Sequence, residues 1–398
     1  MSETPAPNPQ DFSLCRHPYR VLFPLGWFLA WWAAAPWVLY ALKVSIPYPF
    51  QTHSFIFIQG VLTTFAAGFL FTMLPRRLGA PGPRVWQMLV VIMVPLYHAY
   101  FVWQQNIGLG HAIWLIEGLV LLEFSASRIL GKKGTRSGPA AFVWVPIGFL
   151  CGCLGSASEA IRELWTAEYS WEWYRFSRVL LTQGMFLCLA MGIGAMFFPL
   201  TARKEASVDA TMTENPRQRR MGHLLGAVGL LTGFWLDATP LRPMGGYLAA
   251  GSVALVLLIS GRIYRLPSVG GTQRRLIWIS AWCLPLGLLL ASLMPERPQV
   301  GFHVLFIGGL LLLTLSVALH VGFAHTQGQE LVHRPLPSVR VFGVLLLLAL
   351  CTRIYAEYFS MDRMDSLGIA AGCLLAALAV WGVLLMPRFV RSWRGMTW

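Results

Sequence analysis

The amino-acid sequence predicts an all-α, polytopic membrane protein with about twelve transmembrane helices. The first observation is composition, because 56% of the 398 residues are apolar and only 12% are charged. A soluble domain usually carries about 25% charged residues. The second observation is that the charges cluster between apolar runs, each near the roughly 20 residues needed to cross a bilayer. No segment is long and polar enough to form a separate soluble domain.

The apolar runs are bounded by Pro, Gly and charged residues, and these boundaries predict the individual spans. A disordered cytoplasmic segment (residues 1–21) is expected to precede the transmembrane domain (residues 22–386), and a cytoplasmic tail (residues 387–398) to follow it. Residues 159–178 form the longest loop on the side away from the termini, and this loop is expected to hold a helix lying on the membrane surface. The predicted spans are residues 22–43, 53–74, 85–104, 109–130, 140–159, 177–200, 222–237, 244–263, 276–293, 302–325, 338–357 and 366–386.

The basic residues predict the orientation of the spans, because Lys and Arg are enriched in cytoplasmic loops. If the N-terminus is cytoplasmic, 23 of the 31 Lys and Arg residues fall on the cytoplasmic side and the other eight fall on the opposite side. This excess alternates from loop to loop, which a missed span would disturb. We therefore expect both termini to be cytoplasmic. The net charge of +14 then reflects membrane orientation, and nucleic acid is not expected as a partner.

Histidines are candidate functional residues, because ionisable groups inside lipid are costly. The predicted topology places His53, His98, His111 and His303 at a similar depth in the outer leaflet, on four different helices. Imidazole binds haem iron and copper, so these four side chains predict a cofactor site. His53, His303 and His98 are the expected metal ligands. A histidine at a span end also commonly contacts headgroups or a carbonyl, and His98 is equally consistent with a hydrogen-bonded core residue.

Other ionisable side chains also lie within or at the ends of predicted spans. Glu117 and Glu123 are in the fourth span, and Glu117 is expected to orient a ligand or to carry protons. Arg178, Arg353 and Glu357 are either partners inside the membrane or residues at the outer ends of their helices.

Cysteines and short motifs exclude several other kinds of site. Six of the seven cysteines lie in apolar runs, which indicates small buried residues and not a disulfide framework. The pair Cys151 and Cys153 is interpreted in the same way, because a helix directs these two thiols apart. No CxxCH motif is present, so covalent c-type haem is not expected. No Walker A motif is present, so ATP hydrolysis is not expected.

Several stretches of the sequence carry a resemblance to a known family. They are His17-Pro-Tyr-Arg20, Thr52-His53-Ser54 through Pro75, Gly192-Ile193-Gly194 to Thr201, His303 through His325-Thr326, Leu348 to Arg353, and Trp381 to Arg388. Together they resemble NnrS, a family of haem- and copper-containing membrane proteins associated with nitric oxide metabolism. The resemblance implies a protein of the bacterial inner (cytoplasmic) membrane that binds haem b, copper, or both. It also implies nitric oxide or another small gas as a ligand.

The sequence keeps some polar residues of the NnrS pattern and changes others. His53, His303 and His325 are retained, which adds His325 to the candidate cofactor ligands. However, His303 and His325 are 22 residues apart on one predicted helix, about 33 Å, so they cannot share one metal ion. The family's polar residues are replaced by Gln51, Ser54, Ala195 and His320. The chain is therefore expected either to keep haem and lose copper, or to lose both.

Two alternative functions are compatible with the same architecture. Twelve spans suit a transporter built from two six-helix halves, although the sequence shows no clear internal repeat. An accessory subunit of a respiratory oxidase or reductase complex would explain the lost polar residues. No residue pattern identifies a catalytic group.

Overall fold

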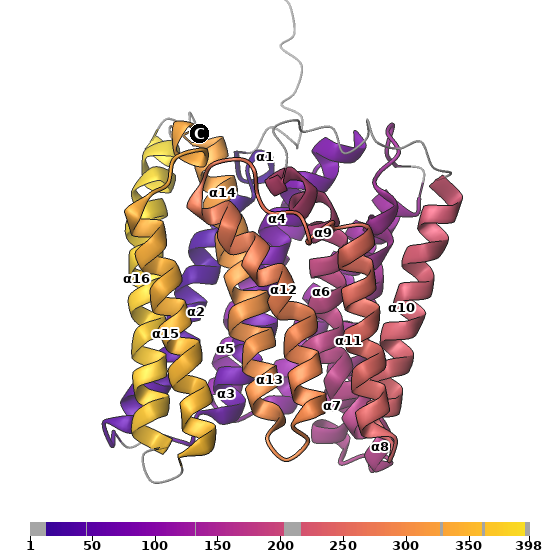
Figure 1. Cartoon of the computed structure of the whole chain (residues 1–398), viewed down its shortest axis with the longest axis vertical. Coiled ribbons are helices and arrows are strands. Elements are labelled where there is room, and N and C mark those ends of the chain that lie inside the picture. The colour runs from indigo at the N-terminus through magenta and orange to yellow at the C-terminus, as the bar shows by residue number, and fades with distance from the viewer. Residues whose placement is uncertain are drawn as a thin grey trace, which may run out of the picture.

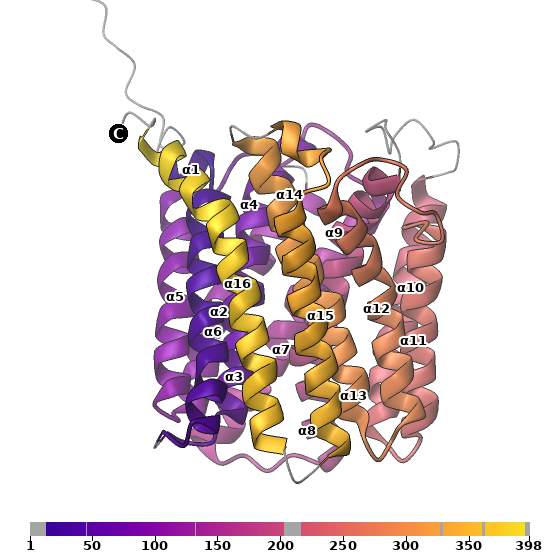
Figure 2. The same ribbon diagram turned by 60° about the vertical axis from the view of Figure 1, so that its left-hand side comes forward.

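The computed structural model describes residues 13–44, 46–131, 133–202, 216–326, 329–359 and 363–394. These ranges are folded as helices, and none of them contains a β-strand. Twelve of the helices are long and apolar enough to cross a membrane, and they run side by side along one axis (Figures 1 and 2). The prediction of an all-α, polytopic fold is confirmed.

Most spans consist of one continuous α-helix. A short 3₁₀ segment, η3 (Ala140–Val143), opens the fifth span, and two short elements, α1 (Ser13–Arg16) and η7 (Gln329–Val332), lie outside the spans. The continuous helices are α2 (Tyr19–Ala41), α5 (Val85–Trp103), α6 (Ile107–Ile129), α7 (Trp144–Trp165), α10 (Pro216–Ala238), α11 (Arg242–Ile259), α12 (Thr272–Leu293), α15 (Pro337–Tyr358) and α16 (Arg363–Arg394).

The second, sixth and tenth spans each contain a π-helical segment between two α-helices. Such segments are rare and occur frequently at functional sites. In each of these spans, between 72% and 89% of an apolar stretch of 18 residues is buried, against 28% for the eleventh span. The three are therefore inner helices of the bundle. They consist of α3 (Phe50–Phe55), η2 (Ile56–Leu62) and α4 (Thr63–Leu78); α8 (Trp171–Val179), η4 (Leu180–Gly184) and α9 (Met185–Ala202); and α13 (Pro298–His303), η6 (Val304–Leu311) and α14 (Leu312–His325).

These three inner spans recur at a fixed interval in the sequence. Gly60, Gly184 and Gly308 each lie in a π segment, and successive members of the set are 124 residues apart. The interval contains four spans, so the three copies cross the bundle in the same direction. The twelve spans therefore divide into three groups of four, and the expectation of no internal repeat is wrong. The first two copies also share five aligned residues: Gln59 and Gln183, Gly60 and Gly184, Ala66 and Ala190, Gly68 and Gly192, and Pro75 and Pro199.

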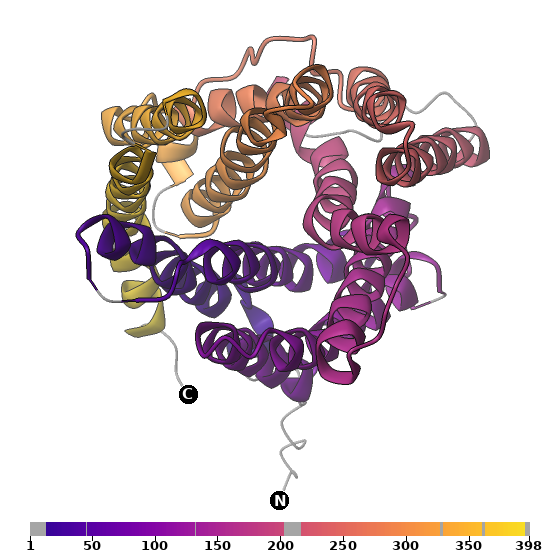
Figure 3. The ribbon, with the colours of Figure 1, turned by 90° about the horizontal axis from the view of Figure 1, so that it is seen from below.

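The two ends of the bundle are distinguished by the ends of the described chain. Helix α1 and the C-terminal end of α16 lie at one end, here named the terminal face, and α3, α8 and α13 lie at the other, here named the distal face (Figures 1 and 2). Seen from the distal face, the spans surround a common centre (Figure 3). Helix α16 packs against α2, so the last span closes the bundle against the first.

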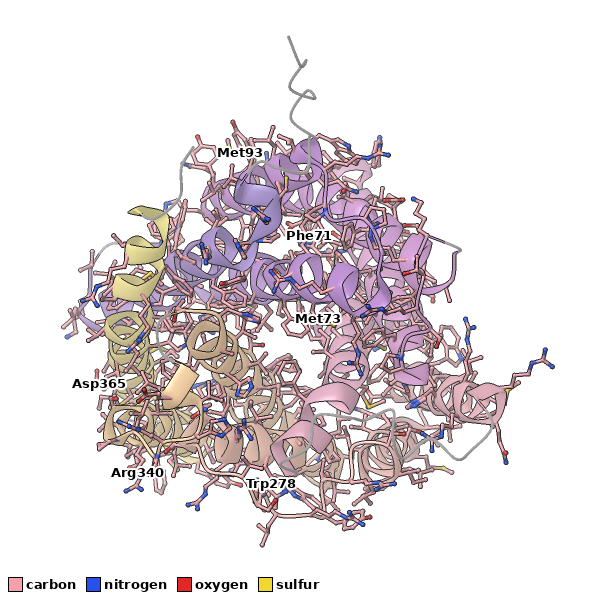
Figure 4. All side chains as sticks on the ribbon, turned by 90° about the horizontal axis from the view of Figure 1, so that it is seen from above. Phe71, Met73, Met93, Trp278, Arg340 and Asp365 are labelled. Atoms are coloured by element: carbon pink, nitrogen blue, oxygen red, sulfur yellow. The ribbon has the colours of Figure 1, made fainter. Side chains whose placement is uncertain are left out.

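Side chains divide between the core and the rim of this bundle. Phe71 lies inside, whereas Met93 and Arg340 lie at the periphery (Figure 4). Phe71 is buried, with its ring 4.4 Å from that of Phe124, and Met93 is exposed. The exposed apolar surface of the outer helices is the surface that lipid would cover.

Two glycines hold α12 and α13 in close contact and so fix where the tenth span begins. A Cβ atom added at Gly301 would lie 2.1 Å from the backbone nitrogen of Ala291 and 2.4 Å from the carbonyl oxygen of Gly287. No other residue type fits this contact unless the two helices separate. Because His303 is two residues further along α13, its position depends on this contact.

The helix boundaries correct some predictions and leave others outside the described chain. Helix α7 continues to Trp165, and α8 begins at Trp171 and runs directly into the sixth span. A separate surface helix within residues 159–178 is therefore not formed. The seventh span is longer than predicted, and α16 extends through most of the predicted tail. Residues 1–12 of the predicted disordered segment and residues 395–398 of the predicted tail lie outside the described residues.

Buried charge pairing gives the physical reason why the α7–α8 connection is short. The Glu159 side chain is 1% exposed and accepts a hydrogen bond of 2.9 Å from Arg162. Arg178 lies 3.5 Å from the same carboxylate. The polar residues of this segment therefore neutralise one another between α7 and the sixth span, so they do not need a surface position.

Candidate functional site

The four histidines predicted to share one depth lie on elements that meet the distal face. His53 is in α3, His98 is near the end of α5, His111 is near the start of α6, and His303 ends α13. The structure divides them into two groups. His98 and His111 are neighbours, with ring centroids 6.4 Å apart. His53 and His303 are each close enough to Arg353 for its charge to act on them.

His53 is held by the backbone of the first span. Its Nδ1 lies 3.0 Å from the carbonyl oxygen of Ala33. Its ring packs between Trp37 and Phe57, with centroid distances of 5.9 and 5.1 Å. When Nδ1–H donates to the Ala33 carbonyl, the lone pair of the neutral ring is on Nε2. No hydrogen bond to this Nε2 is found within the described ranges.

His303 repeats this arrangement on the tenth span. Its Nδ1 lies 2.7 Å from the carbonyl oxygen of Gln299, one helical turn earlier. Its Nε2 likewise has no hydrogen-bond partner in the part of the chain that the structure describes. Both residues are partly buried. The two rings therefore expose the same nitrogen, and in each the other nitrogen is fixed by a backbone carbonyl.

Arg353 links the two histidines electrostatically. Arg353 is close enough to both His53 and His303 for the charge of its guanidinium to act on them. Arg353 donates from Nη1 to Glu357, one turn along α15, and Arg363 lies 3.7 Å from the same carboxylate. Arg353 and Glu357 side chains are 15% and 11% exposed. They are thus largely buried partners in the last two turns of α15, at its distal end.

His98 is occupied by the backbone on both sides of its ring. Its Nδ1 lies 3.0 Å from the carbonyl oxygen of Gly110, and its Nε2 lies 3.3 Å from that of Phe55. The ring is completely buried. A metal would have to displace one of these two contacts. His98 therefore joins three spans as a core residue, which was one of its two predicted roles.

His111 and Glu117 are buried polar side chains without partners. Both ring nitrogens of His111 and both carboxylate oxygens of Glu117 lack a hydrogen bond, and both residues are 0% exposed. The His111 ring packs edge-on against Phe55 at 4.5 Å, and the two histidine rings of this group are 6.4 Å apart. Glu117 makes no contact that would orient His111 as a ligand.

His325 lies at the other end of the tenth span, on the terminal face. The Tyr19 hydroxyl donates to its carbonyl oxygen at 3.4 Å, and its ring lies 5.9 Å from the Tyr19 ring. Arg20, Arg76 and His17 surround it. Burial, together with these arginines, lowers the pKa of His17 to about 4. His325 is therefore separate from the His53–His303 pair.

A comparison with protein-family models shows the family of this chain. A model described as NnrS protein matches residues 13–392, nearly the whole length. The chain belongs to the NnrS family. No curated protein matches its sequence. The resemblance found on separate motifs thus extends over all twelve spans.

His53 and His303 each have the arrangement of a metal-binding histidine. Histidines that bind a metal usually donate their other N–H to a carbonyl or carboxylate, and both residues have such a carbonyl. Histidine is a common ligand of haem iron, and haem is associated with the NnrS family, so these are the two residues that would hold it. Arg353 adds a positive charge beside the pair, and guanidinium groups pair well with carboxylates such as those of haem.

Copper does not fit the described residues equally well. No group of three or more His, Cys, Asp or Glu side chains in these ranges is arranged to hold a metal ion. The predicted metal set of His53, His303 and His98 is not gathered into such a group, because His98 lies against Gly110 and Phe55. Cys151 and Cys153 are buried free thiols, in agreement with their interpretation as small core residues.

Sequence reasoning missed the groups that position the two histidines. Trp37, one of several tryptophans near span ends, packs against His53. The carbonyls of Ala33 and Gln299 have no signal in the sequence, because any residue supplies a backbone oxygen. The recurring glycines at positions 60, 184 and 308 did carry a signal, namely their equal spacing.

Proposed function

We propose that this NnrS-family protein binds haem between His53 and His303 and acts in the handling of nitric oxide or another small neutral gas. The observation that carries the proposal is the matched geometry of the two histidines. Each has Nδ1 on a carbonyl and Nε2 free. Haem iron, when bound there, supplies a centre that binds gases and exchanges electrons.

The residues around the pair have separate roles in this proposal. Trp37 and Phe57 hold the His53 ring and exclude water from it. Arg353 balances negative charge on the cofactor, and Glu357 holds Arg353 in place. We infer a bacterial inner-membrane location with cytoplasmic termini, which puts this site near the periplasmic side.

The internal repeat supports this proposal over a transporter. Transporters of twelve spans are commonly two six-helix halves, whereas this chain has three groups of four that run in the same direction. An accessory role in a respiratory complex stays an alternative, which copurification with a larger complex would favour.

The direct test is the visible spectrum of the protein purified in mild detergent, oxidised and then reduced with dithionite, with haem content measured on the same sample. The wild type is expected to show a Soret band that sharpens on reduction. His53→Ala and His303→Ala should each lose haem or change its spectrum. Added imidazole should restore the spectrum of each variant, because it supplies the missing nitrogen ligand.

His325→Ala is the matched control, since it removes a histidine at the opposite end of the tenth span. It should retain haem with an unchanged spectrum. A colourless, folded wild-type protein would contradict the proposal. Unchanged haem in both His53→Ala and His303→Ala would contradict the assigned ligands.

A further inference from the structure

The three inner spans surround a cavity at the centre of the bundle. The cavity measures about 70 Å³. On each span it is lined by the residues two, five, six and nine positions after Gly60, Gly184 and Gly308. The same four offsets occur in all three copies of the repeat. The cavity therefore lies at the meeting point of the three groups of four spans and is a product of the repeat, not of a local packing defect.

The lining is almost entirely apolar. The residues six positions after the three glycines are Ala66, Ala190 and Thr314. Thr314 is the one lining side chain, among the residues assigned to the cavity, that carries a polar atom. A buried water needs two to four polar partners, so one hydroxyl holds water poorly. No charged side chain lines the space, so an ion is not accommodated either.

The Thr314 hydroxyl is also free, unlike other threonines of the inner spans. Thr64 donates to the carbonyl of Gly60 at 2.6 Å, and Thr72 donates to that of Gly68 at 2.8 Å. No hydrogen bond of Thr314 is found in the described ranges. Its hydroxyl is therefore available to a guest that accepts a weak hydrogen bond.

We propose that this central cavity binds a small neutral gas molecule, at a site separate from the His53–His303 pair. Its volume suits a diatomic molecule, and apolar cavities in proteins stay dry and take up apolar guests such as xenon. Thr314 distinguishes this site from a purely apolar void, because it donates to a guest such as nitric oxide or dioxygen.

The cavity lies deeper in the bundle than the histidines, on the same two spans. Leu62 follows His53 by nine residues, and Leu310 follows His303 by seven, so the separation along the axis is about 10–14 Å. A gas held there lies near the two histidines and among apolar side chains. Supply of gas to haem rests on the proposed function, whereas gas binding by the cavity does not.

Xenon tests the cavity itself, with no requirement for haem. The purified protein is equilibrated with xenon under pressure, and xenon is located by anomalous scattering from crystals or by its effect on NMR spectra of labelled methyl groups. Wild-type protein should bind xenon among Ala66, Ala190 and Thr314. Ala66→Phe fills the space and should abolish binding. Ala376→Phe adds the same side chain at an exposed position of α16 and should leave xenon binding unchanged.

A second variant protects the test against misfolding. If Ala66→Phe fails to fold, Ala190→Leu reduces the same space from another span and should also abolish xenon binding. Wild-type protein without xenon in the cavity would overturn the proposal. A chain of ordered waters, or a lipid or detergent tail in the cavity, would also overturn it.

Flash photolysis of nitric oxide bound to the reduced protein separates the two proposals. Ala66→Phe should change the fraction of nitric oxide that rebinds before it escapes, and Ala376→Phe should not. Thr314→Val keeps the shape of the side chain and removes the hydroxyl, so it should retain xenon and shift the nitric oxide rebinding. If the protein lacks haem but binds xenon, the haem proposal fails and the cavity proposal stands.

Discussion

The two ring nitrogens of a histidine have different roles at His53 and His303. Nδ1 fixes the ring against a backbone carbonyl at 3.0 Å in one case and 2.7 Å in the other. This contact selects the neutral tautomer whose lone pair is on Nε2, the form that binds iron. At His98 both nitrogens face carbonyl oxygens. The same residue type therefore serves as a ligand candidate or as a core residue, depending on its backbone neighbours.

Arg353 and Glu357 provide a prediction at the scale of single residues. Arg353→Met leaves the Glu357 carboxylate, 11% exposed, with only the longer contact to Arg363. Removing one partner of a buried pair usually costs about 3 kcal/mol or more. We expect a clearly lower thermal unfolding temperature in detergent. The double variant Arg353→Met/Glu357→Gln should recover most of the loss, because no unpaired charge remains.

The exposed pair Arg334 and Glu330 is the matched control for this prediction. It has the same spacing along the chain but side-chain exposures of 65% and 80%, and exposed pairs contribute little. Arg334→Met should leave the unfolding temperature nearly unchanged. Equal effects of Arg334→Met and Arg353→Met would contradict the assignment of Arg353 to a buried pair.

The sequence alone could identify part of this site. His53, His303, Arg353 and Glu357 were predicted because ionisable residues inside a span are rare and costly. The sequence could not show that His53 is a ligand candidate and His98 a core residue, since the difference lies in backbone carbonyls contributed by other spans. Nor could it show that Glu117 has no partner, because that depends on the packing of α6 against its neighbours.

At the scale of elements, the π segments determine which way each inner span faces. A π-helix closes its hydrogen bonds over five residues instead of four, so the helix rotates relative to a continuous α-helix. His303 immediately precedes the segment η6, and His53 lies three residues before the segment η2. The segments thus let one span direct a histidine to the site at the distal face and apolar residues to the central cavity.

The α12–α13 contact gives a prediction at this scale. Gly301→Ala places a methyl group 2.1 Å from the Ala291 nitrogen, a backbone atom that cannot rotate away. Overpacking of this kind typically costs about 1–3 kcal/mol, and it displaces α13 and its terminal residue His303. We expect a lower unfolding temperature together with weaker retention of haem, measured as the haem lost during purification.

Gly372→Ala in α16 is the control, because a Cβ there meets no atom within 4 Å. Alanine stabilises a helix interior by about 1 kcal/mol relative to glycine, so this variant should be neutral or slightly more stable. If Gly301→Ala behaves like Gly372→Ala, the close contact between α12 and α13 does not position the tenth span.

The spans were largely predictable from hydropathy, and the observed helices agree with the predicted ranges to within a few residues at most ends. The sixth span shows why the rest was not. Its first turns, from Trp171, are polar and aromatic, so hydropathy favoured a surface loop, while the contact of Arg178 with the buried Glu159 carboxylate attaches this helix to α7. The π segments also escaped prediction, since residues such as Ile56 to Leu62 suit an α-helix equally well.

At the scale of the whole molecule, three groups of four spans build a bundle with a common centre (Figure 3). Each group contributes one span to the lining of the central cavity. The repeat gives a simple account of the two sites. The cavity is formed where the three inner spans meet, whereas the histidine pair is formed by only two of them, because the second group carries no histidine at the corresponding depth.

The orientation of the bundle is the prediction at this scale. The basic residues predict that the terminal face lies in the cytoplasm and the distal face in the periplasm. A fluorescent protein fused after Trp398 should fluoresce, and alkaline phosphatase at the same position should be inactive, because that enzyme needs an oxidising compartment for its disulfides. Phosphatase fused within residues 166–170, between α7 and α8, should be active. The reverse pattern of activities would contradict this orientation. The two histidines would then lie near the cytoplasm, and any electron donor or partner of the proposed haem would be a cytoplasmic one.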